Sequence, residues 1–372
     1  MVKHPSGDAV PGADAHWMRR ALQLAARGLG RTTPNPVVGA CVVTPDGVVV
    51  GQGAHERAGE PHAEVHALEA AGARARGATL YCTLEPCAHT GRTGPCTDRI
   101  LAAGIRRVVA PVADPDPRVS GRGFAILREH GVDVAVGVER RAAIEINLPF
   151  FTAKQKGRPF VILKAAVSRD GYIAARPGER TLLTSAAANR RAQYVRARMD
   201  AVAVGSGTVL VDDPRLTVRE VYRERPLVRV VFDRRLRTPP SARLFSTLEA
   251  GPVIIFTSSE TLAASRSHAD ALAGAGACVV AVDRPGIGPM LEKLVGFDVQ
   301  SVLLEGGSGV HGAAWDEDVV DCVHLYMTRH VLGPGGVRFL GGRRFSPAAL
   351  VDAHYTDCGG DVILEGYVHR PD

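Results

Sequence analysis

Hydrophobic positions along this chain follow helix-like and strand-like spacings in alternation. Pro, Gly and Asp residues separate the apolar runs, as expected at the ends of helices and strands. The pattern in the first half predicts a helix over 16–30, two strands around a Pro-Asp-Gly turn in 37–53, a helix over 62–72, a strand over 78–87, a helix over 96–104 and a strand over 105–112.

A second series of apolar strands begins near residue 160. Its spacing leaves room for helices between the strands, which favours a mostly parallel, helix-covered sheet. The predicted strands lie in the stretches 160–168, 199–210, 227–233, 252–258, 277–283, 301–307 and 322–328.

The length of the chain, 372 residues, exceeds what one hydrophobic core usually holds, so two domains are expected. The stretch 147–159, "NLPFFTAKQKGRP", mixes polar, Pro and Gly residues and is predicted to be the linker. We therefore place one α/β domain at 14–150 and a second α/β domain at 158–370.

Composition and charge narrow the possible partners. The chain is 45% hydrophobic and 23% charged, and no apolar run approaches the about 20 residues of a membrane span. No secretory signal opens it, so a cytoplasmic protein without membrane partners is expected. The net charge of +6 admits anions, but aromatics are only 5% and the arginines are scattered. Phosphorylated small molecules are therefore favoured over nucleic acid.

The seven cysteines do not suit a disulfide framework, because the number is odd and four fall within the first 100 residues. Reduced thiols, with a metal among the first four, fit better. Cys278, Cys322 and Cys358 stand in apolar surroundings and are predicted to be small buried hydrophobic residues.

Three of the early residues have the chemistry of a catalytic zinc site. His62, Cys87 and Cys96 supply an imidazole and two thiolates, which leaves the fourth zinc position for water. Glu64 lies two residues from the first ligand and is placed to carry a proton from that water to a leaving amine. The order His-x-Glu followed by Pro-Cys is that of zinc deaminases, although eight residues rather than two separate the cysteines.

Two other kinds of metal site share part of this pattern. His62 and His66 have the i, i+4 spacing of a zinc protease, but that motif needs Glu where this chain has Ala63, so the protease interpretation fails. A closed structural site would recruit Cys82 or His89 as a fourth ligand, and Glu64 would then have no role.

The second half does not name a reaction by itself. Gly306 to Gly309 lie between a predicted strand and a predicted helix, where their amides would cradle a phosphate or simply form a turn. Thr208, Asp212, Arg215 and Arg219 follow another strand, as a phosphate-binding edge or a solvated loop would.

Four motifs of the first half resemble the bifunctional deaminase and reductase family of riboflavin biosynthesis: "TPNPVVGACVV", "GEPHAEVHAL", "LEPCAHTGRTGPC" and "DPDPRVSGRG". The resemblance extends from about residue 14 to residue 368. It implies a cytidine-deaminase-like three-layer αβα domain followed by a dihydrofolate-reductase-like domain. The Cys-x8-Cys spacing is that family's own, which implies that His62, Cys87 and Cys96 bind Zn²⁺ and that Glu64 is catalytic.

The resemblance also gives roles to residues that carry no signal by themselves. Asn35 and His55 resemble pocket residues that hold the pyrimidine, whereas alone they are a turn residue and a surface histidine. The loop 88–94 would lie near the ribose phosphate of a phosphoribosylated pyrimidine. A homo-oligomer, a dimer or a tetramer, is implied as well.

In the second half, "LKAAVSRDGYIA", "VGSGTVLVDDPRLTVR" and "LLEGGSGVHG" resemble the NADPH-dependent reductase of the same family. The resemblance implies two groups of contact residues. The NADPH contacts would be Ala166, Leu182, Thr208, Asp212 and the glycine turn from Gly307, Ser308 and Gly309 to Ala313. The substrate contacts would be Arg196, Leu216, Arg219 and Glu305, with the arginines on the phosphate. Two departures from the family add candidates: Arg234, where the family often has a small hydroxyl residue, for the 2′-phosphate of NADPH, and Arg180, in place of a serine, for the substrate phosphate.

The chain departs from the family pattern in two segments. Arg180 stands where the family has serine and Leu182 where it has tryptophan; Arg169 and Tyr172 replace a leucine and a basic residue. Losing an aromatic face beside the cofactor costs about 1 kcal/mol. An active reductase of altered affinity is therefore expected, with an impaired or repurposed reductase as the alternative. A nucleic-acid base deaminase would leave the second half unexplained.

Overall fold

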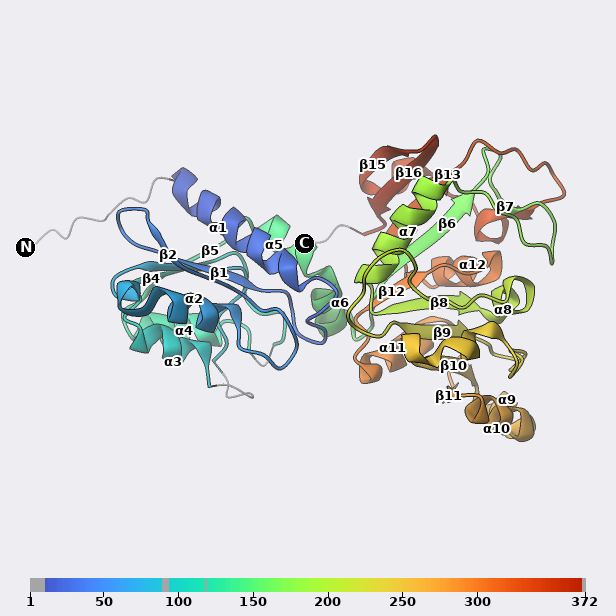
Figure 1. Ribbon diagram of the computed structural model, residues 1–372, viewed down its shortest axis with the longest axis horizontal. Helices are drawn as coiled ribbons and strands as arrows, with labels where there is room; N and C mark the ends of the chain where they lie inside the picture. Colours follow the sequence, from blue (N-terminus) through green and yellow to red (C-terminus); the bar gives the residue numbers. More distant parts are fainter. Residues whose placement is uncertain (1–10, 89–93, 118, 370–372) are drawn as a thin grey trace, which may run out of the picture. The chain divides into compact units, whose positions relative to one another are not determined.

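The computed structural model describes residues 11–88, 94–117 and 119–369 (Figure 1). Two compact units divide the chain between Gln155 and Lys156. Within the described residues, no helix combines the length and the apolar character needed to cross a membrane.

The first unit contains one five-stranded sheet in the order β2-β1-β3-β4-β5. β1 is antiparallel to β2 and β3, and β3, β4 and β5 are parallel. The strands are β1 (Gly39–Val43), β2 (Val49–Ala54), β3 (Thr79–Cys82), β4 (Arg107–Ala110) and β5 (Asp133–Val136). The helices are α1 (Pro11–Ala25), α2 (Ala63–Ala71), α3 (Cys96–Ala102), α4 (Arg122–Glu129), α5 (Arg140–Ile146) and α6 (Leu148–Lys156).

Helices cover both faces of this sheet, so the expected three-layer αβα arrangement is confirmed (Figure 1). On one face α1 buries Met18 and Leu24 against Cys41 and Tyr81. On the other face α2, α3 and α4 bury a larger apolar cluster that includes Leu68, Ile100 and Leu127. Apolar residues on both faces of β1 explain why all five of its positions are buried.

The two units divide within the predicted linker stretch 147–159, but most of that stretch is a helix and not irregular. Residues 148–156 form α6, and Phe150 and Phe151 are buried in the same apolar cluster as Ile144 of α5. Burying an aromatic side chain stabilises a fold by about 1.5–3 kcal/mol. Two adjacent phenylalanines therefore outweigh the Pro and Gly residues that suggested a linker. Only Gly157, with φ +66°, and its neighbours connect α6 to β6 (Phe160–Val167).

The second unit contains a nine-stranded sheet in the order β11-β10-β9-β8-β12-β6-β13-β16-β15. The strands from β11 to β13 are parallel, as predicted, and β16 and β15 continue the sheet antiparallel. Besides β6 they are β8 (Ala201–Gly205), β9 (Val228–Phe232), β10 (Val253–Ser258), β11 (Ala277–Val282), β12 (Ser301–Leu304), β13 (Cys322–Met327), β15 (Val351–Cys358) and β16 (Asp361–Tyr367). A separate pair joins β7 (Tyr172–Ala174) to β14 (Val337–Arg338).

Helices lie on both faces of the large sheet (Figure 1). On one face α11 and α12 bury Leu291 and Ala314; on the other, α7 buries Ala192 beside Tyr326 and α10 buries Leu272. The helices are α7 (Ala186–Arg198), α8 (Ser206–Asp212), α9 (Ser259–Ala264), α10 (Arg266–Gly274), α11 (Gly288–Leu294) and α12 (Ser308–Asp316).

Edge strands account for one wrong expectation about the cysteines. Cys322, on the interior strand β13, is buried as predicted. Cys278 is exposed because β11 is an edge strand whose burial is incomplete, and Cys358 at the end of β15 is half-buried. An apolar strand pattern alone does not distinguish an edge strand from an interior one.

Candidate active sites

The structure brings His62, Cys87 and Cys96 together in the first unit. His62 immediately precedes α2, Cys87 lies in the loop after β3, and Cys96 is the first residue of α3. The His62 Nδ1 atom lies 3.3 Å from Cys96 Sγ and 3.5 Å from Cys87 Sγ. Among the described residues this is the one group of three or more His, Cys, Asp or Glu side chains whose ligand atoms all lie within 4.8 Å.

The donor set of this cluster fits a zinc ion. One imidazole nitrogen and two sulfurs are the ligands that catalytic zinc uses with an open fourth position. The backbone N–H of Cys96 donates to Cys87 Sγ over 3.3 Å. Hydrogen bonding to Cys96 and His62 lowers the pKa of the Cys87 thiol to about 4, which favours the thiolate that a metal requires. The proposed alternative ligand Cys82 is buried outside this cluster, and His89 lies outside the described residues.

Glu64 lies beside this cluster but is not part of it. Its side chain is 3% exposed, and its Oε2 atom has no hydrogen-bond partner among the described residues. Burial raises the pKa of this carboxyl group. An unpaired buried carboxyl oxygen is costly, and such groups are found where a substrate or water completes the site. The geometry therefore suits a proton carrier next to a metal.

The close contact between α2 and β2 fixes where α2 begins. A Cβ atom on Gly53 would lie 2.3 Å from the Ala63 carbonyl oxygen, so a larger residue in β2 would displace the helix. His62 and Glu64 stand at this end of α2, and their position therefore depends on the absence of a side chain at Gly53.

His55 is buried and not the surface histidine that its sequence context suggested. It is 2% exposed, its Nδ1 atom lies 3.2 Å from the Pro61 carbonyl oxygen, and its Nε2 atom lies 3.1 Å from Asn35 Nδ2. Because a carbonyl only accepts, Nδ1 is the protonated nitrogen and Nε2 accepts from the Asn35 amide. The His55 ring lies 5.5 Å from the His62 ring, so the structure brings Asn35 and His55 to the zinc-type cluster.

Two buried residues that sequence analysis missed hold the loops around this site. Asn147 accepts from the Val37 N–H at 2.8 Å and donates to the Val37 carbonyl at 2.9 Å, which fixes the segment that carries Asn35. The carboxylate of Glu85 accepts from the backbone N–H groups of Gly121 and Gly123, both at 2.8 Å, and from that of Asp114. Both residues are polar types that are common on protein surfaces, and nothing in their spacing reveals these partners.

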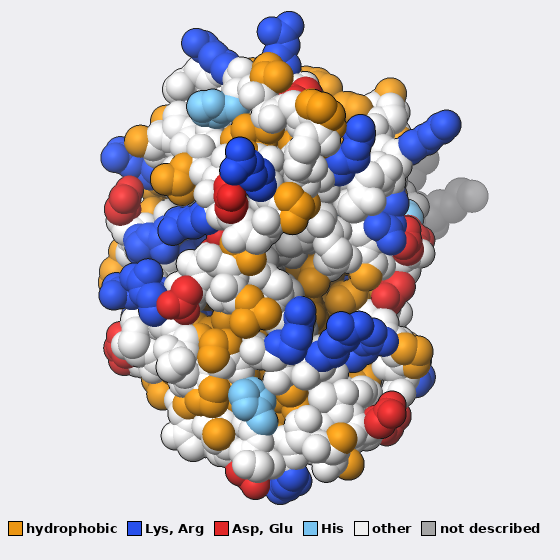
Figure 2. Space-filling view, turned by 90° about the vertical axis from the view of Figure 1, so that its right-hand side faces the viewer, with side chains coloured by type: hydrophobic (Ala, Val, Ile, Leu, Met, Phe, Trp, Pro, Cys, Tyr) orange, Lys and Arg blue, Asp and Glu red, His pale blue; other side chains and the backbone are white. Residues whose placement is uncertain are grey.

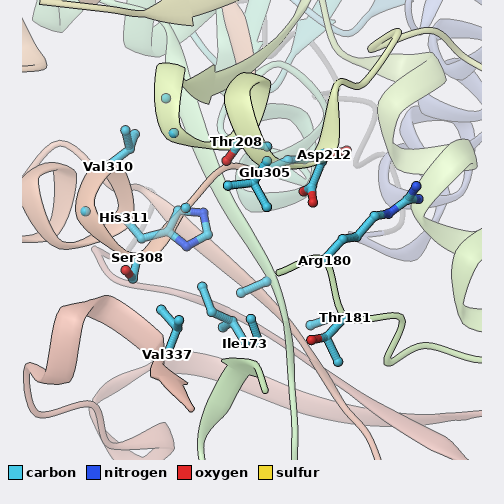
Figure 3. Close-up of a pocket in the computed structure, with 18 of the residues that line it drawn as sticks. Ile173, Arg180, Thr181, Thr208, Asp212, Glu305, Ser308, Val310, His311 and Val337 are labelled. Carbon is cyan, nitrogen blue, oxygen red and sulfur yellow. The ribbon is translucent and has the colours of Figure 1, made fainter. Parts of the chain in front are cut away.

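In the second unit, a cavity of about 790 Å³ opens at the carboxyl ends of β6, β8, β9 and β12 (Figure 3). Ligands bind at this edge in parallel α/β sheets. Of the reductase residues expected from sequence, those that line the cavity are Ala166, Arg180, Leu182, Arg196, Thr208, Asp212, Arg219, Arg234, Glu305, Gly307, Ser308 and Gly309.

Leu216 is the exception among the expected residues. Its side chain is 3% exposed and packs with Val209 and Val231 in an apolar cluster, so it does not line the cavity. Its φ of +56° shows that the backbone turns sharply there. A substrate contact at this position would have to involve the backbone, because the side chain points into the core.

The expected phosphate cradle has the required backbone. Gly307 has φ +66°, which favours glycine, and α12 begins at the next residue. Its Cβ position would lie 3.3 Å from Thr208 Oγ1. The start of the nine-residue α12 therefore faces the cavity together with Thr208, as suits an anionic group.

Arg196 and Glu305 form a closed pair at the cavity wall. Arg196 Nε and Nη2 lie 3.0 and 2.5 Å from the two carboxylate oxygens of Glu305, and Nη1 donates to the Thr217 carbonyl at 2.6 Å. Burial by itself would raise the pKa of the Glu305 carboxyl group. The positive charges of Arg196 and Lys164 have the larger effect, so this pKa is lowered. Arg196 is thus engaged within the protein, whereas Arg219 is exposed at the cavity.

Lys164 is a cavity residue that sequence analysis missed. It stands on β6 two residues before Ala166, and its ammonium lies 5.0 Å from the centre of the Tyr326 ring. Burial lowers the pKa of this lysine, although the nearby Glu305 acts in the opposite direction. A lysine with a lowered pKa in a cleft is suited to giving up a proton. A lone lysine within an apolar strand offers no sequence signal of this.

Three arginines line the cavity after β9: Arg234, Arg235 and Arg237. Asp233 holds their turn, because its Oδ2 atom accepts from both the N–H and the hydroxyl of Thr238 at 2.7 Å. Arg237 donates to Ser206 Oγ at 3.0 Å. Figure 2 shows basic side chains at the rim of a hollow on one face of the molecule, with hydrophobic side chains inside it.

Comparisons with known proteins match both halves of the chain. A family model for the cytidine and deoxycytidylate deaminase zinc-binding region matches residues 12–112, and a model for the RibD C-terminal domain matches residues 159–364. The riboflavin biosynthesis protein RibD of Aquifex aeolicus is 41% identical over 322 residues, which cover 87% of this chain and 88% of that protein. The chain belongs to the RibD family.

Two solved RibD-type structures resemble the whole chain. RibD of Acinetobacter baumannii has a TM-score of 0.83 and 34% identity, and it covers 96% of this chain and 99% of its own. A Thermotoga maritima protein described as a diaminohydroxyphosphoribosylaminopyrimidine deaminase/5-amino-6-(5-phosphoribosylamino)uracil reductase has a TM-score of 0.81 and 35% identity, with the same coverage. The expected family and fold class are therefore confirmed.

Membership of the RibD family assigns a broad role to each unit. The first half is a zinc-binding deaminase domain, the second is a reductase domain, and together they make a bifunctional enzyme of riboflavin biosynthesis. The cluster at His62 and the cavity beside Lys164 lie in the corresponding halves of the chain. The loop expected near the ribose phosphate, 88–94, falls largely outside the described residues.

Proposed function

We propose that this RibD-family protein removes an amino group from 2,5-diamino-6-(5-phosphoribosylamino)pyrimidin-4(3H)-one by hydrolysis. It then reduces the ribosyl group of the product to ribityl with NADPH. The observation that carries the first step is the unpaired, buried Glu64 oxygen beside His62, Cys87 and Cys96. The relatives' printed names and the two matching domain models support the pathway and the order of the steps.

For the deamination, His62, Cys87 and Cys96 would hold Zn²⁺, which supplies a Lewis acid that makes water nucleophilic near neutral pH. Glu64 takes the proton of the attacking water and returns it to the leaving ammonia. His55, fixed by Pro61 as the Nδ1–H tautomer, orients Asn35 toward the pyrimidine. Among the described residues His55 is the hydrogen-bond partner of the Asn35 amide, which leaves its second N–H and its oxygen for the ring.

For the reduction, Thr208 and the turn at Gly307 would hold NADPH, which would supply the hydride that C1′ of the ribosyl group takes up as the C1′–O4′ bond opens. Lys164 gives a proton to O4′, so that the ring oxygen leaves as a hydroxyl. Glu305 holds the charge of Lys164 in place, and Arg196 holds Glu305. Because Arg196 is engaged, we assign the substrate phosphate to Arg219 and Arg180 rather than to all three arginines.

The single most informative experiment supplies the phosphoribosylated diaminopyrimidinone with and without NADPH, and follows ammonia release and NADPH oxidation separately. We expect ammonia release in both cases and NADPH oxidation only after deamination. Ammonia release without later NADPH oxidation would favour the impaired or repurposed reductase. The impaired or repurposed reductase is the second candidate function. It rests on residues 178–184, where Leu182 replaces a tryptophan of the family and is 77% exposed.

A fragment of residues 1–156 is expected to fold and release ammonia without NADPH. This fragment keeps α6, whose Phe150 and Phe151 complete the apolar cluster of the first unit. A fragment that ends at residue 147 lacks both side chains and should unfold at a lower temperature. Thermal unfolding and ammonia release measured on both fragments test this. If fragment 1–156 is folded and zinc-loaded but inactive, the deaminase pocket needs a contribution from beyond it.

The preference for NADPH over NADH is expected to fall tenfold or more, about 1.4 kcal/mol, in Arg234→Ala. The exposed guanidiniums at 234, 235 and 237 suit the 2′-phosphate that distinguishes the two cofactors. Arg180→Ala should instead weaken the binding of the phosphorylated substrate and leave the preference for NADPH over NADH unchanged. Both cofactors are titrated against the parent protein and the two variants. Equal affinity of the parent for NADH and NADPH, or an unchanged ratio in Arg234→Ala, contradicts this role.

A further inference from the structure

His311 is a buried titratable residue in the reductase cavity that the proposed mechanism does not use. It is the fourth residue of α12, is 1% exposed, and lines the cavity. Figure 3 draws its ring between Ser308, Glu305 and Ile173. Phe339 packs against the ring at a centroid distance of 6.2 Å, nearly edge to face. The ring is therefore held in one orientation.

The hydrogen bonding of His311 decides its tautomer. Nε2 lies 3.2 Å from the Leu304 carbonyl oxygen, which only accepts, so Nε2 carries the proton. Burial lowers the pKa of the imidazole to about 4, and the ring is neutral at physiological pH. Nδ1 is then a hydrogen-bond acceptor, and it has no partner among the described residues.

An unpaired buried acceptor costs roughly 1–3 kcal/mol relative to a paired one. Here the cost falls on a side chain at the wall of a ligand cavity, one helical turn from the Gly307 cradle and near Lys164 and Glu305. Of the side chains near it in Figure 3, Ile173 and Val337 have no donor, and the Ser308 hydroxyl does not form a hydrogen bond with Nδ1 among the described residues. A ligand in the cavity is the partner that the site still lacks.

We propose that Nδ1 of His311 accepts a hydrogen bond from a hydroxyl or amide N–H of the ligands that fill the reductase cavity. This inference rests on the proposed reductase function. Two sources have the required chemistry: the carboxamide of the nicotinamide cofactor, and a hydroxyl of the substrate's ribosyl group. His311 is a ligand-binding residue in either case. The hydrogen bond from Nε2 to the Leu304 carbonyl orients the ring so that Nδ1 is the acceptor.

Two substitutions separate this role from a purely structural one. In His311→Gln, the amide nitrogen can replace Nε2 and keep the hydrogen bond to the Leu304 carbonyl, but no acceptor occupies the position of Nδ1. In His311→Asn, the amide oxygen can replace Nδ1 as acceptor, but the bond to Leu304 is lost. A ligand contact makes Gln the harmful variant, whereas a structural anchor makes Asn the harmful one.

The test measures the dissociation constant of NADPH, the KM and kcat for the deaminated substrate, and the melting temperature of the full-length parent protein and both variants. We expect His311→Gln to weaken one of the two ligands about tenfold, about 1.4 kcal/mol, with its melting temperature little changed. His311→Asn should stay within about threefold of the parent. Weaker NADPH binding identifies the cofactor carboxamide as the donor, and a raised KM identifies the substrate hydroxyl.

Unchanged affinity for both ligands in His311→Gln would overturn the proposal. So would a larger loss in His311→Asn than in His311→Gln, because that order follows the Leu304 anchor. If both His311→Gln and His311→Asn lower the melting temperature and the affinities for NADPH and substrate together, His311 has a structural role. Failure of the proposed reductase function looks different, since the parent protein itself would then oxidise no NADPH.

Discussion

Replacing Glu64 by glutamine is expected to lower the rate of ammonia release by a factor on the order of 10² or more while the protein keeps about one zinc per chain. Glutamine has nearly the shape of glutamate but cannot take a proton from water. The carboxyl group lies beside His62, Cys87 and Cys96 without belonging to the metal-type cluster, so the ligands stay intact. Metal analysis and an ammonia assay on the purified variant check both halves of this expectation.

Glu69→Gln is the matched control, because Glu69 lies on the same helix and is exposed. It should retain the parent rate. A second control is the reductase of the Glu64→Gln protein, which should oxidise NADPH at the parent rate when given substrate that has already been deaminated. Loss of zinc from Glu64→Gln would make Glu64 a ligand and would refute its assignment as proton carrier.

Much of the fold could be predicted from sequence because its strands carry strong local patterns. The parallel strands of the second unit contain continuous apolar runs, such as 302–304, that are buried on both faces. The antiparallel end of the sheet was not predicted, since six consecutive positions of β15 from Asp352 to Asp357 are exposed and the strand contains no continuous apolar run. The error at α6 had the opposite cause, because Pro149 and Gly157 obscured two buried phenylalanines.

The metal-type cluster could be predicted because its residue types are rare and their order is diagnostic. The residues that support this cluster, Asn147 and Glu85, could not be predicted from the sequence. Asn147 clamps the Val37 segment across a sequence separation of 110 residues, and Glu85 binds backbone groups 29 to 39 residues away. Such contacts depend on the tertiary fold, and the side chains involved are also common on protein surfaces.

The reductase site shows the limit of a resemblance carried over residue by residue. All but one of the expected residues line a single cavity at the carboxyl edge of the sheet. The resemblance did not reveal that Arg196 is hydrogen-bonded to Glu305 and Thr217, nor that Leu216 points into the core. Which partner a charged side chain chooses follows from distances that sequence does not contain.

Replacing Lys164 by methionine is expected to lower NADPH oxidation by a factor on the order of 10² or more and to leave ammonia release unchanged. Methionine keeps most of the apolar stem that packs near Tyr326 but has no proton to give. In the proposed reduction the ribosyl ring opens only if O4′ receives a proton, and Lys164 is a lysine at the cavity wall whose pKa is lowered by burial. Single-turnover measurement with pre-deaminated substrate and saturating NADPH isolates this step.

Lys164→Arg distinguishes proton donation from a purely electrostatic role. Arginine keeps the positive charge beside Glu305, but its guanidinium does not lose a proton at physiological pH. If Lys164 acts as an acid, the arginine variant should be nearly as slow as the methionine variant while it binds NADPH normally. Recovery of the parent rate in Lys164→Arg would show that charge alone suffices, and a loss of less than tenfold in Lys164→Met would place the proton donor elsewhere in the cavity. Ammonia release by the same samples reports whether the other half of the chain is intact.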